Sequence, residues 1–299
     1  MSAAEVARDH ASARRRLALV AAGEAGRLWG LVDPGRIAAS WLELLPRLLV
    51  LLTGAQQAVA GRADGYLDEV LAEQRVSARA EGRVSAQALA GVASDGRDLA
   101  DLLYQPAIST LVGIKRGATV EQALSGGGAD LDMIVRTQVA DAGRVADQVA
   151  MAARPQVTGY VRMLVGKSCS RCAILAGRRY QWNTGFNRHP RCDCIHIPAR
   201  EDTADDLRTD PKRYFASLSA AEQDRLFTVA GAEAIRAGAD IGQVVNARRG
   251  MYEAGGRQFT RTGTRRKKRP RLMPEQILRE AGGDRAEALR LLKLHGYLR

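Results

Sequence analysis

The stretch DLDMIVRTQVADAGRVADQVAMAARP, residues 130–155, decides the class of fold. Its apolar side chains recur at every third or fourth position, which places them along one side of an α-helix. The stripe consists of Leu131, Ile134, Val135, Val139, Ala142, Val145, Ala146 and Val149. Pro155 does not fit a helix interior, so the helix is predicted to end near it. We expect the stripe to face the core of a helical bundle.

Four more helices are predicted upstream of this stretch. They cover residues 2–27, 36–60, 65–80 and 97–114, and breaks that contain Gly and Asp join them. Residues 2–27 are rich in Ala, Arg and Glu and mostly polar, whereas apolar residues recur at helical spacing in residues 36–60. The segment LSGGGAD, which begins at Leu124, is predicted to interrupt the helical pattern. Residues 1–155 are therefore expected to form an elongated helical domain.

The chain changes in character after Pro155. The sequence QVTGYVRML alternates β-branched, aromatic and polar residues as a strand does, and GRRYQWN and CIHIP are candidates for two more short strands. We expect residues 156–200 to form a small α+β module. A helical segment, residues 201–256, contains a capping box at Ser219–Glu222. A basic flexible linker, residues 257–273, and a short helical hairpin, residues 274–299, complete the prediction.

The amino-acid composition and the net charge limit the classes of function that the chain can have. The 299 residues are 46% hydrophobic but only 5% aromatic, the balance of a helix-rich chain with a substantial core. The formal net charge is +12, which favours a polyanionic partner such as nucleic acid or an acidic protein surface. No secretory signal is recognisable, and no apolar segment reaches the roughly 20 residues that a membrane span needs. We expect a soluble chain without a membrane partner.

All four cysteines lie within CSRCAILAGRRYQWNTGFNRHPRCDC, Cys169–Cys194. Cys169 and Cys172 can meet in a tight turn, whereas Cys192 and Cys194 share one side of an extended segment. Four soft ligands in two pairs suit a structural zinc ion, which makes the module zinc-knuckle-like. His189 could replace one thiolate or support the ligands by a hydrogen bond. The alternatives are reduced thiols packed without metal, disulfides, and a redox Cys-x-x-Cys.

The same segment resembles the signature of the Mu F-like minor head proteins, the phage head morphogenesis family. The shared features are the Cys-x-x-Cys, the Leu-x-Gly at Leu175–Gly177 and the closing His-Pro-x-Cys-x-Cys at His189–Cys194. The firm part of the resemblance covers residues 130–198. The segments GADIGQVVNARRGMY, residues 238–252, and LLKLHGYL, residues 291–298, resemble the actinobacterial-phage branch of the family. The first 125 residues are similar only in being helical.

The resemblance implies a minor structural protein, present in few copies, that assists head assembly and genome packaging or delivery. The implied partners are the portal protein, the major capsid or scaffold protein, and genome DNA bound without regard to sequence. The implied location is the inside of the virion head near the portal, after assembly in the host cytoplasm. Some relatives carry a protease or a toxin, but no such segment is recognisable here, so we expect no enzymatic activity.

A basic tract near the C-terminus supplies the candidate nucleic-acid contacts. Its residues are Arg261, Arg265, Arg266, Lys267, Lys268, Arg269 and Arg271. The only aromatic residues nearby are Tyr252 and Phe259, so we expect salt-sensitive phosphate contact with little base stacking. The alternative is a solvated linker whose charge only aids solubility.

Two rival functions remain. A metal-dependent HNH-like nuclease would draw its catalytic residues from Asp193, His196, Glu201 and Asp202. A zinc-containing DNA-binding regulator would use the two closing helices as a helix-turn-helix.

Overall fold

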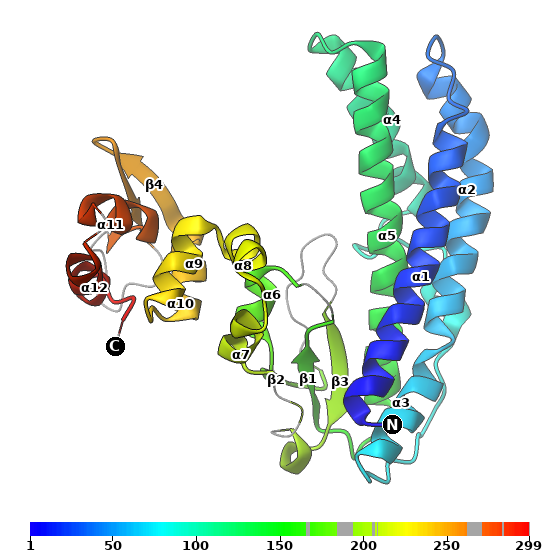
Figure 1. The fold of residues 1–299 in the computed structure, drawn as a ribbon. Coiled ribbons are helices and arrows are strands. Elements are labelled where there is room, and N and C mark those ends of the chain that lie inside the picture. The colour runs from blue at the N-terminus through cyan, green and yellow to red at the C-terminus, as the bar shows by residue number, and fades with distance from the viewer. Residues whose placement is uncertain are drawn as a thin grey trace. The chain divides into compact units, whose positions relative to one another are not determined.

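The chain divides into two units, which are described separately (Figure 1). Unit 1 consists of Met1–Val165 and Arg179–Leu207, and unit 2 of Gly166–Arg178 and Arg208–Arg299. The computed structural model describes residues 1–165, 168–183, 194–204, 207, 209–261, 271–282 and 284–298.

Unit 1 is built on a bundle of four long helices: α1 (Ala3–Trp29), α2 (Ile37–Ala60), α4 (Leu99–Lys115) and α5 (Val120–Ala152) (Figure 1). The shorter α3 (Ala63–Glu73) follows α2, and a single 3-10 turn, η1 (Ala86–Leu89), lies in the connection to α4. These elements confirm that helices are present where the first half predicted them, but the helix predicted over residues 65–80 is shorter than expected, because α3 ends at Glu73. Most of the stripe on α5 is buried as expected, although Val145 and Val149 are about 40% exposed.

The predicted break at Leu124 is wrong, because α5 runs continuously through Gly126–Gly128. The Trp29 indole lies against Gly127 and Gly128 and donates a hydrogen bond to the Leu124 carbonyl over 2.9 Å. A Cβ atom at Gly127 would be 2.6 Å from the Trp29 ring, which is closer than real Cβ contacts. The glycines therefore allow α1 to approach a helix that they do not interrupt.

By length and composition alone, the stretch Ile37–Glu73 could cross a membrane, since its most apolar window has a mean hydropathy of 1.5. The core helix of a soluble protein passes the same test. Within the bundle, α2 buries Trp41, Leu48 and Leu52 completely, and the Trp41 indole donates to the Leu103 carbonyl of α4 over 2.9 Å.

The three predicted strands after Pro155 are present, but they do not form a separate module. Strands β1 (Gly159–Met163), β2 (Arg179–Gln181) and β3 (Ile195–Ala199) form an antiparallel sheet in the order β2-β1-β3. Every residue of β1 and β3 is buried, and Tyr160 and Ile197 share a hydrophobic core with Leu67 of α3. Packing against the bundle therefore stabilises the sheet, which belongs to unit 1 and not to a separate α+β module of residues 156–200.

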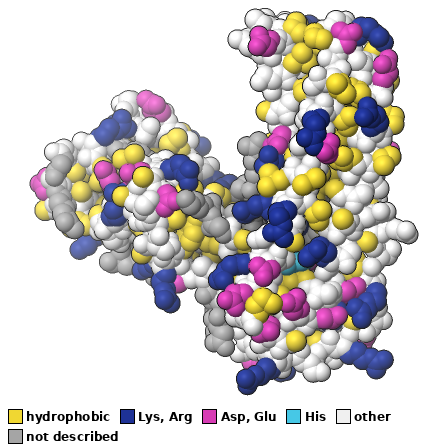
Figure 2. Space-filling view, turned by 45° about the vertical axis from the view of Figure 1, so that its right-hand side comes forward, with side chains coloured by type: hydrophobic (Ala, Val, Ile, Leu, Met, Phe, Trp, Pro, Cys, Tyr) yellow, Lys and Arg dark blue, Asp and Glu magenta, His cyan; other side chains and the backbone are white. Residues whose placement is uncertain are grey.

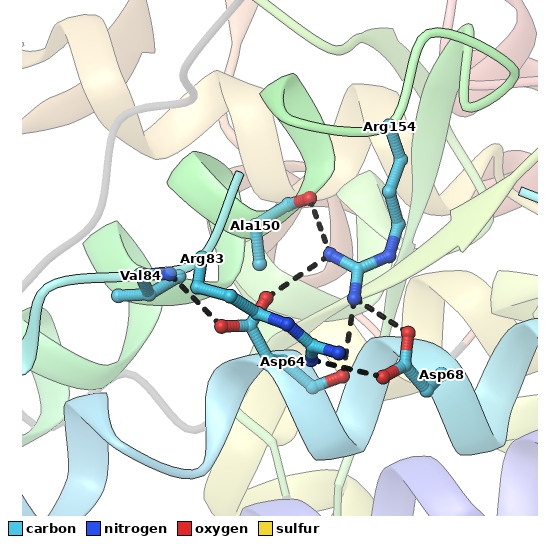
Figure 3. Close-up of polar contacts among 6 residues, drawn as sticks. All are labelled: Asp64, Asp68, Arg83, Val84, Ala150 and Arg154. Atoms are coloured by element: carbon cyan, nitrogen blue, oxygen red, sulfur yellow. Dashed lines mark hydrogen bonds and ion pairs between the residues drawn. The ribbon is translucent and has the colours of Figure 1, made fainter. Parts of the chain in front are cut away.

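A buried arginine fixes the connection between α3 and α4 to the end of α5 (Figure 3). Arg154 is fully buried and donates to the carboxylates of Asp64 and Asp68, over 3.2 Å and 2.5 Å, and to the Ala150 carbonyl over 2.8 Å. Asp64 also accepts from the Val84 backbone N–H over 2.9 Å. The two acids of α3 thus join the bundle to the long connection that follows it.

Unit 2 combines short helices with a second sheet. Its helices are α6 (Ser170–Leu175), α7 (Pro211–Ala216), α8 (Ala220–Phe227), α9 (Val229–Arg236), α10 (Ile241–Ala247), α11 (Pro274–Ala281) and α12 (Arg285–Leu294). Strands β4 (Met251–Ala254), β5 (Arg257–Thr260) and β6 (Arg271–Leu272) form the antiparallel sheet. The described residues also include the 3-10 turns η2 (Glu201–Thr203) in unit 1 and η4 (Arg248–Gly250) in unit 2.

The predicted capping box of Ser219 and Glu222 is confirmed, and it begins α8. Asp284 caps α12, because its carboxylate accepts from the backbone N–H groups of Ala286 and Glu287. Gly296, at a φ of 73°, follows the end of α12 in the left-handed conformation that glycine adopts without strain.

The predicted linker, residues 257–273, is bounded by strands. Thr260 of β5 pairs directly with Arg271 of β6, so the chain leaves the sheet and returns to the adjacent position. Residues 262–270, which include most of the basic tract, lie outside the described residues.

Candidate functional site

The cysteines are distributed over both units. In unit 2, Cys169 is the N-cap residue of α6 and Cys172 lies buried in the first turn of that helix. In unit 1, Cys194 is buried immediately before β3, and its carbonyl accepts a hydrogen bond from Arg144 over 3.3 Å. Cys192 and His189 fall outside the described residues.

The donor chemistry of the cysteine pairs fits a zinc ion, because a Cys-x-x-Cys at the start of a helix is a common way to supply two thiolates. Among the residues that the structure describes, no three His, Cys, Asp or Glu side chains are grouped to hold a metal. Cys192 and His189 do not belong to these described residues. The four-thiolate site therefore stays a prediction.

The net positive charge of the chain comes from unit 2. Unit 2 contains 23 Lys and Arg residues against 10 Asp and Glu, whereas unit 1 contains 22 against 23. The chain's formal surplus of +12 thus arises from +13 in unit 2 and −1 in unit 1. The net charges of the two units therefore favour electrostatic attraction of a polyanion toward unit 2.

The β4–β5 hairpin presents part of this charge next to aromatic rings. Tyr252 and Phe259 are directly opposite each other in the ladder, with ring centroids 5.7 Å apart and planes 23° apart. The Arg261 guanidinium lies 4.9 Å from the centroid of the Tyr252 ring, within the range of cation–π attraction. Arg249, just before β4, is exposed. Neither Arg249 nor Arg261 forms an ion pair with a carboxylate among the described residues of the chain.

Arg271 does not fit the role predicted for it. Only 5% of the residue is exposed, and its guanidinium lies 4.2 Å from the ring centroid of buried Tyr297. It donates to the carbonyls of His295 and Gln243 over 3.2 Å and 3.3 Å. Burial lowers the pKa of Arg271. Its charge supports the fold of unit 2, and a phosphate could not reach it without opening the core.

Arg265–Arg269, the centre of the predicted nucleic-acid site, lies outside the described residues. Two described residues that flank it, Thr260 and Arg271, are paired with each other in the β5–β6 ladder.

A buried polar cluster in unit 1 was not anticipated from the sequence. Asp147 of α5 is 1% exposed and accepts from His10 Nε2 over 2.9 Å and from Arg14 over 3.1 Å. The Tyr66 ring is stacked on His10 at 3.9 Å, and its hydroxyl donates to the His196 carbonyl over 2.6 Å. The cluster thereby connects α1, α3, α5 and β3.

Burial and charge act in opposition within this cluster. Burial raises the pKa of Asp147, but the attraction and hydrogen bond of His10, together with Arg14, outweigh it and hold that pKa below its usual value. Burial and the nearby Arg144 charge lower the pKa of Arg14 to about 10. Asp147 is therefore an ionised carboxylate at neutral pH. The sequence contained a signal for this cluster, because Asp147 directly follows Ala146, which belongs to the apolar stripe on α5.

His10 and Tyr66 also line a pocket between α1 and α3, with a volume of about 550 Å³. Arg16 and Arg62 contribute basic side chains to its rim, while Asp9 and Glu69 contribute acidic ones. Figure 2 shows a small patch of histidine atoms at the surface of the bundle, with Lys or Arg side chains on one side of the patch and Asp or Glu side chains on the other. The pocket is thus polar and mixed in charge, unlike the basic surface of unit 2.

His196, which the nuclease hypothesis would use as a catalytic residue, lies in a buried environment like that of a core residue. It lies on β3 with 4% of its surface exposed, and its ring is 4.4 Å from that of Tyr160. Glu201 and Asp202 lie in the exposed turn η2. Asp193 is outside the described residues.

Comparison with known proteins identifies the family. The model of the VG15 protein family matches residues 1–221, which contain all of unit 1 and extend to the beginning of α8. No curated protein and no solved structure matches the chain. The match indicates a phage gene product and is not specific to Mu F-like proteins. Because the family model covers well over half of the sequence, the chain belongs to the VG15 protein family.

Proposed function

We propose that the chain is a minor structural protein of a phage head, associated with the portal and the head interior, that assists head assembly and genome packaging or delivery. Membership of a phage protein family supports the general assignment. The resemblance of the cysteine segment to Mu F-like minor head proteins supports the narrower one. In this proposal unit 2 contacts genome DNA without regard to sequence, and unit 1 contacts the portal and the major capsid or scaffold protein.

The observation that carries the DNA contact is the separation of charge between the units. Unit 2 has the whole positive surplus, +13, on its residues, although the two units have almost the same number of basic side chains. The difference lies in the acids, which balance the bases in unit 1 and not in unit 2. Contact with phosphates releases counterions in proportion to the number of phosphates neutralised, which makes such binding strongly dependent on salt.

Binding of the full-length chain to random-sequence duplex DNA tests the assignment to unit 2. Replacing Arg249 and Arg261 by Ser should weaken binding and lower the steepness of the salt dependence by about 2, at ~0.9 per phosphate. Replacing Arg47 and Arg116 by Ser is the matched control, because both are exposed on the helices of unit 1 or at their ends. Equal losses in the two variants would show that DNA does not distinguish the units.

The association with the particle needs a separate experiment. Mass spectrometry of purified phage heads, before and after DNA release, should detect the chain at a low and constant ratio to the portal protein. A chain found only in the infected cell, and never in particles, would contradict the structural role while leaving the DNA contact open to its own test.

A further inference from the structure

We infer that the β4–β5 hairpin is a stacking surface for unpaired bases, so that unit 2 binds single-stranded nucleic acid through its bases as well as through its phosphates. This inference rests on the proposed DNA contact and adds a ligand class to it. It also departs from the sequence-based expectation that stacking contributes little.

The hairpin has one side on which aromatic and basic side chains come together. Residues directly opposite each other in an antiparallel ladder project to the same side of the sheet. Tyr252 is opposite Phe259, and Ala254 is opposite Arg257, so these four share a side. Glu253, the only acid of the two strands, projects to the other side with its partner Gln258. The aromatic side therefore has no acid of its own.

The rings and the arginines are arranged in layers. Phe259 is partly buried against the core of unit 2, which anchors it. Tyr252 stacks on Phe259, and the Arg261 guanidinium lies over the Tyr252 ring. Nucleobases stack on tyrosine rings and on guanidinium planes with similar geometry, so a base can extend or enter this row. A duplex would not offer its base faces for such contact.

The two arginines beside the aromatic rings differ in whether a carboxylate already compensates their charge. Arg257 is held by Glu280 of α11 through two hydrogen bonds of 2.6 and 2.7 Å, so its charge is compensated. Arg261 has no carboxylate partner among the described residues, and it can contact the phosphate of a base stacked on Tyr252.

The end of the hairpin leaves room for a strand of nucleic acid. Gly255 and Gly256 form the two-residue turn, with φ values of 57° and 70°, as the tight primed turns of hairpins require. A Cβ atom at either glycine would meet no other atom within 4 Å. The two residues of the turn themselves therefore have no side chain that could obstruct a ligand on the Tyr252 side.

Two ligands of equal length separate stacking from charge: a labelled oligothymidylate, and a strand of the same phosphate number made of abasic sites. The full-length chain should bind oligothymidylate about tenfold more tightly, because one stacked base contributes ~1–3 kcal/mol. Tyr252→Leu should abolish this preference and leave binding to the abasic strand unchanged. Tyr252→Phe keeps the ring and should keep the preference, which controls for disturbance of the hairpin.

The outcomes distinguish this inference from the proposed function. Equal, salt-dependent binding of both strands by the unmodified chain would overturn the stacking surface while the phosphate contact stands. A preference that survives in Tyr252→Leu would also overturn it. If the unmodified chain binds neither strand nor duplex, the proposed DNA contact itself is wrong.

Discussion

The close approach of α1 and α4 to the glycines of α5 can be tested by adding a single methyl group. Gly126 and Gly127 are neighbours in the same helix, but a Cβ at Gly126 would meet nothing within 4 Å. A Cβ at Gly127 would be 2.6 Å from the Trp29 ring and 3.0 Å from the Pro106 carbonyl oxygen, and closer still to the Thr110 hydroxyl. Alanine at these adjacent positions should therefore have opposite effects on stability.

The magnitudes follow from two known effects. Gly126→Ala should stabilise unit 1 by up to about 1 kcal/mol, since alanine has the higher helix propensity. Gly127→Ala gains the same propensity but overpacks the contact, which typically costs about 1–3 kcal/mol. The neighbours cannot move away freely, because Trp29 donates to the Leu124 carbonyl and Thr110 to the Pro106 carbonyl. We expect Gly127→Ala to be the less stable of the two by ~2 kcal/mol.

Urea unfolding followed by far-ultraviolet circular dichroism measures this difference as a shift in midpoint at constant slope. If Gly127→Ala were as stable as Gly126→Ala, or more stable, the packing of α1 and α4 on α5 would be incorrect, and the Gly-rich segment would more plausibly be a break.

Three further predictions concern the buried cluster and the cysteines. Asp147→Asn leaves His10 and Arg14 buried without their anion and should destabilise the chain by about 3–5 kcal/mol in urea; a loss below ~1 kcal/mol would contradict the ion cluster. The lowered pKa of Asp147 means that its contribution is complete above its unfolded pKa of about 3.9 and is lost as pH falls through its folded pKa. The urea midpoint should therefore drop in acid in the unmodified chain and less steeply in Asp147→Asn, and parallel profiles would refute this. Elemental analysis should find one zinc per chain, lost with a chelator and in Cys169→Ser, whereas purified chain without stoichiometric metal would contradict the site.

Local patterns in the sequence predicted the elements well. The strands around Tyr160 and Ile197 and the capping box at Ser219 are present as expected. The misplaced start of α5 also had a local signal that the glycines obscured. Thr119 and Gln122 form a capping box, and the helix begins there and not at Asp130. Short-range hydrogen bonds of this kind depend on few residues and are readable from spacing.

Contacts between distant residues could not be predicted in the same way. Gly127 seemed a helix breaker because its partner Trp29 is almost a hundred residues away in the chain. Arg271 seemed a surface residue because the buried Tyr297 ring on which it lies is also remote in sequence. The Tyr252–Phe259 pair is a local contact across the Gly255–Gly256 turn, and it was missed because neither this hairpin nor its register was predicted from the sequence. Glycine, arginine and tyrosine each occur in several structural roles, and the residue that each contacts in the folded chain determines its role.

The dependence of DNA affinity on salt tests the central claim, that unit 2 contacts DNA through its basic residues, most directly. Full-length chain is titrated with random-sequence duplex over a series of salt concentrations, and the unmodified protein is compared with a variant in which Arg265, Arg266, Lys267, Lys268 and Arg269 are replaced by Ser. If each of these residues neutralises a phosphate, the slope of log affinity against log salt should become shallower by up to about 4.5. An unchanged slope, or binding that does not weaken with salt in either protein, would contradict the account.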